Sequence, residues 1–275
     1  LGKGITTASV GKILQMHGYN VTAMKIDPYI NCDAGTLRPT EHGEVWVTED
    51  GGEIDQDLGH YERFLDINIP KYHNITSGQV YGAVIDKERK GKYLGKTVQP
   101  IPHVTNEIKN RIRRPAKDKN YDFILVEIGG TVGDYENVLF LEAVRQMKLE
   151  GDKVLFVHVT YVPVLDALGE AKTKPTQHSV KLLREIGIQP DFIVARADDP
   201  LDSVRKEKIA LFCNVREEDV ISDSNIDHVY AVPLLFEEQQ LCKKILRKMR
   251  LRKDVEDVKP WKDFITNIRN LKESY

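Results

Sequence analysis

The chain has 275 residues, with 40 Lys and Arg against 42 Asp and Glu, so its formal net charge is only −2. Such a balance gives no global field toward nucleic acid or a membrane surface, and any attraction for polyanions must be local. The hydrophobic fraction of 41% and the charged fraction of 30% are ordinary for a globular protein of one large or two small domains.

The cysteines and the apolar runs exclude further classes of protein. Cys32, Cys213 and Cys242 form no CxxC pair and have no His at ligand spacing, which argues against a zinc module and favours a reducing, cytoplasmic compartment. No apolar run reaches the roughly 18 residues that span a bilayer, and no signal peptide is visible.

The first residues, LGKG at positions 1–4 followed by Ile5, have the composition of a phosphate-binding loop. Glycines let backbone N–H groups approach phosphate oxygens, a lysine offsets charge, and a helix begins directly afterwards. A glycine-rich turn before a helix is the alternative. The apolar strand and first glycines that usually precede such a loop are not seen, so we expect the visible chain to begin inside it.

Apolar runs without clean alternation predict strands that are covered on both faces, as in parallel sheets. The predicted strands are Val21–Ile26, Phe123–Ile128, Val154–Val162 and Asp191–Arg196.

Between these strands, apolar residues recur at the spacing of an amphipathic helix. The first predicted helix contains Val10 and ends at Gly18. The other predicted helices are Val104–Ile112, Val138–Met147, Val180–Ile186 and Leu241–Leu251. The alternation predicts an α/β fold, P-loop or Rossmann-like, with a mostly parallel sheet and helices on both faces. Ligands of such sheets bind at the carboxyl ends of the strands.

Two regions break the alternation. Residues 27 to about 95 are rich in Gly, Pro, Asp and Tyr, and we expect loops and short elements there. Residues 253–275 are charged and contain Pro260 and Trp261, which indicates a helical tail or linker after a domain formed by residues 1–252.

Acidic residues stand where nucleotide-hydrolysing enzymes hold Mg²⁺. Glu127 lies at the end of an apolar strand and runs into a glycine-rich turn, and the segment 51–60 offers further carboxylates. One carboxylate from each place would suffice for a metal that also binds a triphosphate. The alternatives are a helix cap for Glu127 and a solvated acidic turn for 51–60.

Two basic features accompany these acids. Lys25 lies near the end of the predicted strand Val21–Ile26, although a surface lysine is the alternative. The run 169–179, GEAKTKPTQHS, places two lysines around a hydroxyl before a helix expected to begin near Thr176, which is typical of an anion site. Solvated loop lysines are the commoner use of such a run. Together the features indicate two anionic substrates meeting around one ion, as in a kinase-like step.

Seven segments in order resemble the amidoligase (synthetase) domain of the CTP synthase family. They are LGKGI, KIDPYINCDAGT, EHGEVWVTEDGGEIDQDLGHYERF, ERKGKYLGKTVQPIPHVT, VEIGGTVGDYE, GEAKTKPTQHSV and KIALFCNV. The resemblance implies an ATP-dependent amination of UTP to CTP through a 4-phosphorylated UTP that ammonia attacks. It also implies Mg²⁺, CTP as feedback inhibitor and a homotetramer, with no nucleic acid or membrane partner.

The resemblance also implies residue roles. Lys3, Lys25, Asp57 and Glu127 would be catalytic, with Asp57 and Glu127 as the Mg²⁺ ligands. ATP would be bound by Gly2, Lys3, Gly4, Ile5, Asp57, Arg196, Ser224, Asn225 and Ile226. UTP or CTP would be bound by Gln99, Asp134, Tyr135, Glu136, Lys172, Thr173, Lys174, Pro175, Thr176, Gln177 and Lys208. His42 would belong to a lid between the substrate and the entry of ammonia.

Family members continue into a glutaminase domain after a linker, and no Cys, His and Glu triad for glutamine hydrolysis can be assigned in this chain. We therefore expect it to use free ammonia. A nucleotide-switched ATPase of the partition-protein type is the rival interpretation, although it would not need the basic run 172–177. Carboxyl phosphorylation like that of dethiobiotin synthetase is a third.

Overall fold

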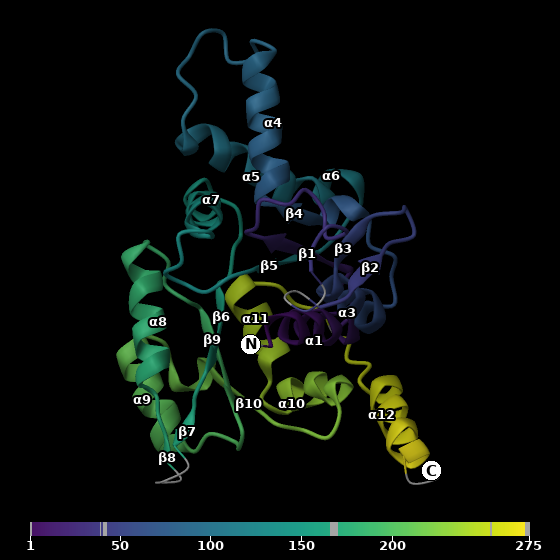
Figure 1. Cartoon of the computed structure of the whole chain (residues 1–275). Helices are drawn as coiled ribbons and strands as arrows, with labels where there is room; N and C mark the ends of the chain where they lie inside the picture. Colours follow the sequence, from purple (N-terminus) through teal and green to yellow (C-terminus); the bar gives the residue numbers. More distant parts are fainter. Residues whose placement is uncertain (1, 39, 41–42, 166–169, 254, 273–275) are drawn as a thin grey trace. The chain divides into compact units, whose positions relative to one another are not determined.

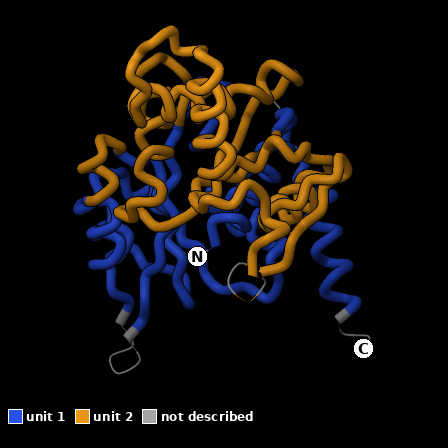
Figure 2. The backbone as a smooth tube through the Cα atoms, turned by 45° about the horizontal axis from the view of Figure 1, so that its top comes forward, with its two compact units in different colours: residues 1–21, 155–181, 189–275 blue, residues 22–154, 182–188 orange. Residues whose placement is uncertain are grey.

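The computed structural model describes residues 2–38, 40, 43–165, 170–253 and 255–272 (Figure 1). The chain divides into two compact units, each built from segments that are distant in sequence (Figure 2). Unit 1 comprises Leu1–Val21, Leu155–Lys181 and Gln189–Tyr275, and unit 2 comprises Thr22–Val154 and Leu182–Ile188.

Unit 1 contains a three-stranded sheet in the order β10–β9–β6. The central strand β9 (Phe192–Ala197) pairs in parallel with β6 (Val157–Tyr161) and with β10 (Val220–Ser224). A short antiparallel pair, β7 (Val164–Leu165) and β8 (Glu170–Ala171), follows β6. The helices that belong to this unit or begin in it are α1 (Lys3–Met16), α8 (Lys174–Glu185), α9 (Ser203–Cys213), α10 (Val232–Glu238), α11 (Leu241–Met249) and α12 (Lys259–Lys272), with short turns η3 (Glu217–Asp219) and η4 (Val229–Ala231).

Helices cover this sheet because both of its faces are apolar. Ile193 and Ala195 of β9 are fully buried and form a core with Val180 of α8 and with Ile209 and Cys213 of α9. Figure 1 shows α8 and α9 on one side of the strands and α1 and α10 on the other. β9 is buried on both faces, since Phe192 and Val194 are as buried as Ile193 and Ala195, which is what its unalternated sequence predicted. β6 is less buried than predicted, because Val157 and Tyr161 are exposed.

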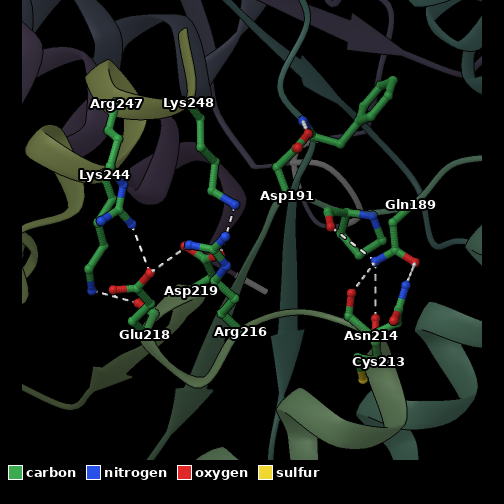
Figure 3. Close-up of polar contacts among 12 residues, drawn as sticks. Gln189, Asp191, Cys213, Asn214, Arg216, Glu218, Asp219, Lys244, Arg247 and Lys248 are labelled. Carbon is green, nitrogen blue, oxygen red and sulfur yellow. Dashed lines mark hydrogen bonds and ion pairs between the residues drawn. The ribbon is translucent and has the colours of Figure 1, made fainter. Parts of the chain in front are cut away.

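Ion pairs fasten the turn before β10 to helix α11, as Figure 3 shows. Lys248 pairs with the buried carboxylate of Asp219 at 2.8 Å, and Arg247 pairs with Glu218 at 2.8 Å. The Lys244 ammonium donates to the main-chain oxygen of Glu218 at 2.5 Å. These contacts fix the start of β10, whose far end carries Ser224.

Unit 2 contains a second three-stranded sheet, in the order β4–β1–β5. β1 (Val21–Asp27) is buried along its whole length and pairs in parallel with β4 (Asn74–Thr76), while β5 (Phe123–Ile128) lies on its other side. The hairpin strands β2 (Val45–Val47) and β3 (Glu53–Asp55) are antiparallel. The helices are α3 (Gln56–Leu65), α4 (Ser77–Arg89), α5 (Thr105–Arg113), α6 (Pro115–Asp118) and α7 (Val138–Leu149), with turns η1 (Lys71–His73) and η2 (Pro100–Val104).

The α/β class with parallel sheets flanked by helices is confirmed, and most predicted elements are present. β5 has the predicted bounds, β1 and β9 end one residue later than predicted, and β6 is shorter than the predicted 154–162. Helix α1 ends before Gly18, whose φ of 78° is the left-handed conformation expected of a glycine stop. The prediction for residues 27–95 is wrong in part, because this segment contains two full helices, α3 and α4.

The charged tail forms a helix, as predicted. Trp261 of α12 donates its indole N–H to the main-chain oxygen of Tyr230 at 2.9 Å, and the ammonium of Lys12 lies 4.6 Å from the Trp261 ring centroid. The role of residues 253–275 as a linker stays a prediction. None of the helices in the described ranges combines the length and the apolar character needed to cross a bilayer.

Candidate functional site

Most of the predicted site residues that the structure describes fall into two groups, one in each unit. The group in unit 2 surrounds the side chain of Lys25, which is only 5% exposed although lysine normally extends into solvent. Its ammonium contacts Asp57 directly and lies 3.3 Å from an oxygen of Glu127, 3.5 Å from Asp55 and 3.6 Å from Asp27. Lys25 is therefore not a surface lysine, and the sequence-predicted Asp57 and Glu127 meet at its charge.

Local structure explains how these side chains are brought together. Lys25 and Asp27 are two positions apart on β1, so their side chains project to the same face of the sheet. Asp55 is the N-cap of α3 and accepts a hydrogen bond from the Asp57 amide at 2.8 Å, while Asp57 lies in the first helical turn. An acid at each of these positions also favours the helix start.

Glu127 is held from β5 by a buried tyrosine. The Tyr61 hydroxyl, on α3, donates to Glu127 Oε2, and the ring of Tyr61 is fully buried. Gly129 follows at the turn after β5, and its amide donates to the main-chain oxygen of Ile26 at 2.7 Å. A Cβ at this glycine would approach that oxygen to 2.8 Å, so the turn lies against β1 only because the residue is glycine.

The charges of the cluster do not balance. Burial lowers the pKa of Lys25, but the surrounding carboxylates, Glu127 first, raise it above the ordinary value, so the side chain stays an ammonium. Burial raises the pKa of Asp27 to about 7, against the opposing effect of Lys25. Four carboxylates around one lysine leave an excess of negative charge, which suits a site that receives a further cation.

The donor set fits Mg²⁺ bound together with phosphate. Asp57 and Glu127 both contact one cationic nitrogen, so their oxygens can face a single positive centre. Among the described residues no three His, Cys, Asp or Glu side chains form a metal-binding group. A cation here would take the rest of its oxygen ligands from water or phosphate, as Mg²⁺ commonly does.

The group in unit 1 begins with the phosphate-loop residues. Gly2 is the N-cap of α1 with a φ of 74°, and its main-chain oxygen accepts from the Thr6 amide at 2.9 Å. A Cβ at Gly2 would lie 3.5 Å from Cδ of Arg196. The start of α1, which includes Lys3, Gly4 and Ile5, is therefore next to the predicted ATP residue Arg196.

Arg196 is oriented by the end of the neighbouring strand β10. Its guanidinium donates to Asp223 at 3.2 Å and to the side-chain oxygen of Asn225 at 3.0 Å. Ser224 is buried between these two residues, and Ile226 follows them. The sequence-predicted Arg196 and 224–226 thus form one contiguous group at the carboxyl ends of β9 and β10.

The basic run also lies in unit 1, and helix α8 begins at Lys174, two residues before the expected start. Thr173, Thr176 and Gln177 are buried, whereas Lys174, Pro175 and the α9 residue Lys208 are exposed. Lys172 is half-buried, and its amide donates to the main-chain oxygen of Pro163 at 2.8 Å. The run is thus an ordered helix start with buried polar anchors and exposed cations.

The remaining predicted residues lie outside these two groups. Gln99, Asp134, Tyr135 and Glu136 are exposed in unit 2, with Tyr135 98% exposed. The Asp134 carboxylate accepts from the Thr131 amide at 3.3 Å within its own turn. His42 lies outside the described residues.

Sequence reasoning assigned no role to Asp27 or Tyr61, and it included Asp55 only among the unassigned carboxylates of 51–60. Asp27 could have been found, because a strand with a functional lysine places the residue two positions later on the same face. Tyr61 gave no signal, since its partner Glu127 is 66 positions away in the sequence.

Comparison with known proteins shows the family to which the chain belongs. A sequence model of the family described as CTP synthase N-terminus matches residues 1–251. The chain is 56% identical to the CTP synthase of Pyrococcus horikoshii over 276 residues, covering 100% of this chain and 51% of the relative. It is 57% identical to the CTP synthase of Saccharolobus solfataricus over 273 residues, with coverage of 98% and 51%.

A more distant relative gives the same result. The CTP synthase of Geobacillus kaustophilus is 53% identical over 276 residues, covering 100% of this chain and 52% of the relative. The chain therefore spans about half the length of these relatives. With a family match over most of its length and more than half of its residues shared with each relative, the chain belongs to the family of CTP synthase N-terminal domains.

Proposed function

We propose that the chain carries out the ATP-dependent amination of UTP, in which UTP, ATP and ammonia give CTP, ADP and phosphate. The observation that carries the proposal is the buried lysine with excess carboxylates at Asp57 and Glu127, in a member of this family. A protonated lysine beside cation-binding carboxylates is suited to a transferring phosphoryl group.

The chemistry explains why such a cluster is needed. The O4 oxygen of uracil is a poor leaving group until the γ-phosphoryl of ATP is transferred to it, a step that releases ADP and removes the proton from N3. Ammonia then adds to C4, the C4–O4 bond breaks, and phosphate leaves while a proton is lost from nitrogen. Mg²⁺ held by Asp57 and Glu127 would neutralise charge on the phosphates. Lys25 remains charged and would donate hydrogen bonds to the phosphoryl oxygens.

The remaining roles follow the same division. In the proposal, Gly2, Lys3, Gly4 and Ile5 bind the ATP phosphates, and Arg196 with 224–226 binds the adenosine part. The residues 172–177 and Lys208 bind the UTP triphosphate and ribose, and Gln99 contacts the pyrimidine. CTP would share the triphosphate residues and add 134–136, while His42 would belong to the lid at the ammonia entry.

The test is formation of CTP from UTP, ATP, Mg²⁺ and ammonium chloride, with ADP measured in the same reaction. Ammonium chloride supplies nitrogen directly, so the readout does not depend on glutamine hydrolysis. The proposal expects ADP and CTP in equal amounts and little ADP without UTP. ADP release that is the same with and without UTP would point to a nucleotide-switched ATPase instead.

The family membership also supports proposals about assembly and location. The chain would act in the cytoplasm as part of a homotetramer. Light scattering during size-exclusion chromatography, with and without UTP and ATP, tests the assembly, and a monomer under all conditions would contradict it.

A further inference from the structure

Two polar side chains on β6 face helix α8 and are not used by the proposed chemistry. His158 shares a hydrogen bond of 2.9 Å with the hydroxyl of Ser179, and Thr160 shares one of 3.1 Å with the hydroxyl of Thr176. The spacing is two residues on the strand and three on the helix, so both pairs lie along one line of contact. Together they form a double polar clamp between β6 and α8.

The clamp reaches the first turn of α8, where the basic run lies. Thr176 is fully buried, and its neighbour Gln177 donates through its side-chain amide to the Thr173 hydroxyl at 3.0 Å. The Gln177 amide N–H also donates to the main-chain oxygen of Thr173 at 3.1 Å. Anchors at Thr176 and Thr173 therefore alternate with the half-buried Lys172 and the exposed Lys174.

Hydrogen bonds are suited to fixing the position of α8 on β6, because a hydrogen bond is favourable only within a narrow range of geometry. Apolar contact between a helix and a sheet allows small shifts along the strand, whereas a buried hydroxyl that loses its partner is destabilising. Binding residues that move by about 1 Å can lose much of their effect on a bound group. Burial and the positive charge of Lys3 lower the pKa of His158 to about 4, so the His158–Ser179 pair is a neutral hydrogen bond near pH 7.

We infer that His158 and Thr160 are positioning residues for nucleotide triphosphate binding, which act by fixing the first turn of α8 and with it Lys172, Lys174 and Gln177. The inference rests on the proposed role of 172–177 in binding UTP. Neither side chain needs to touch the nucleotide.

The experiment measures equilibrium binding of UTP and, separately, of ATP by calorimetry with Mg²⁺ on the full-length protein. Thr160→Val keeps the shape of the side chain and removes the hydroxyl, and Ser179→Ala removes the partner of His158. Each should raise the Kd for UTP by about fivefold and leave the Kd for ATP within about twofold of wild type. Thr160→Ser keeps a hydroxyl and should restore wild-type affinity for UTP.

Hydrogen exchange supplies a readout of position. In Thr160→Val the amide of Gln177 should exchange faster, because it belongs to the turn that the clamp fixes. The matched control is Ser222→Ala on β10, which removes a buried hydroxyl that accepts from the Leu201 amide at 2.9 Å. This control should lower thermal stability by a similar amount without changing the Kd for UTP.

The outcomes separate the inference from the proposed function. If wild type binds UTP and the clamp variants bind it within about twofold, or if Ser222→Ala weakens UTP binding as much, the clamp is only structural. If wild type itself binds no UTP, the proposed function fails and the inference fails with it.

Discussion

Removing the cation from the Lys25 cluster should destabilise the fold far more than removing one anion, although both changes should abolish turnover. Lys25→Met deletes the ammonium that contacts all four carboxylates. Asp57→Asn deletes one carboxylate, the one whose side chain is 29% exposed. The comparison tests whether the cluster carries excess negative charge in the folded protein.

The contact distances give the approximate electrostatic energies within the cluster. At an effective dielectric constant of about 20, an oxygen about 3.5 Å from the ammonium is attracted by roughly 5 kcal/mol. Oxygens that each lie within 3.6 Å of one nitrogen are close together. They are at most about 7 Å apart, so each ionised pair repels by roughly 2 kcal/mol or more. For Asp57 the attraction to Lys25 and the repulsion from its three neighbours nearly cancel.

We therefore expect Asp57→Asn to stay within about 1 kcal/mol of the wild-type free energy of unfolding. Lys25→Met should cost about 3–5 kcal/mol, as the loss of one partner from a buried ionic group does. At about 2–4 °C per kcal/mol for a chain of this size, the thermal midpoint should fall by roughly 10 °C.

Urea and thermal unfolding near pH 7.5 measure both values, and acidification supplies a second check. Burial raises the pKa of Asp27 to about 7 against the opposing effect of Lys25, so in Lys25→Met this pKa should rise further above the unfolded value of about 4. The destabilisation should then shrink as the pH falls from about 7.5 and be smallest below about 4, where this carboxyl becomes protonated in both states. An Asp57→Asn variant as unstable as Lys25→Met would refute the reasoning, as would a cost of Lys25→Met that does not change with pH.

Three further predictions concern ligands and thiols. Glu127→Gln should retain its fold by circular dichroism and lose CTP formation at any Mg²⁺ concentration, and recovery of the rate at high Mg²⁺ would contradict its role. In initial-rate assays, Lys172→Ala should raise the KM for UTP by a factor about ten times larger than its effect on the KM for ATP. Arg196→Ala should instead raise mainly the KM for ATP. Equal effects on the two KM values would show that the residues are assigned to the wrong substrates. Of the three cysteines only Cys32 is exposed, so native protein should release one equivalent of chromophore with a thiol reagent and three after unfolding.

The sequence was sufficient for the elements whose signal is local. The apolar run at 123–128 gave β5 with its exact bounds, and Gly18 marked the end of α1. Residues 27–95 were predicted poorly because the apolar residues of α3 are few and are separated by polar and charged ones. Leu58, Tyr61 and Phe64 are buried and repeat at helical spacing, but the helix is only ten residues long.

The candidate site was predictable to the extent that each residue has a role in its own segment. Asp57 and Glu127 stand at a helix start and a strand end, places where acids are common in phosphate sites. The spacing of 102 positions between Lys25 and Glu127 carries no signal, so their contact at 3.3 Å needed the fold. His158 read as part of an apolar strand, and nothing in its segment indicated that a serine of α8 would face it.

The stability cost and the proposed activity of this site have the same origin. Asp55 and Asp57 favour the start of α3, but the buried strand position of Lys25 would fold better with an apolar residue. The sequence instead places a charge at this buried position, against the preference of folding alone. Polar choices that oppose local preference concentrate at functional sites, because only a ligand that compensates their charge makes the arrangement favourable. On this argument, Mg²⁺ with ATP should stabilise wild type more than it stabilises Asp57→Asn, and an equal rise in thermal midpoint for both would contradict the role of the cluster.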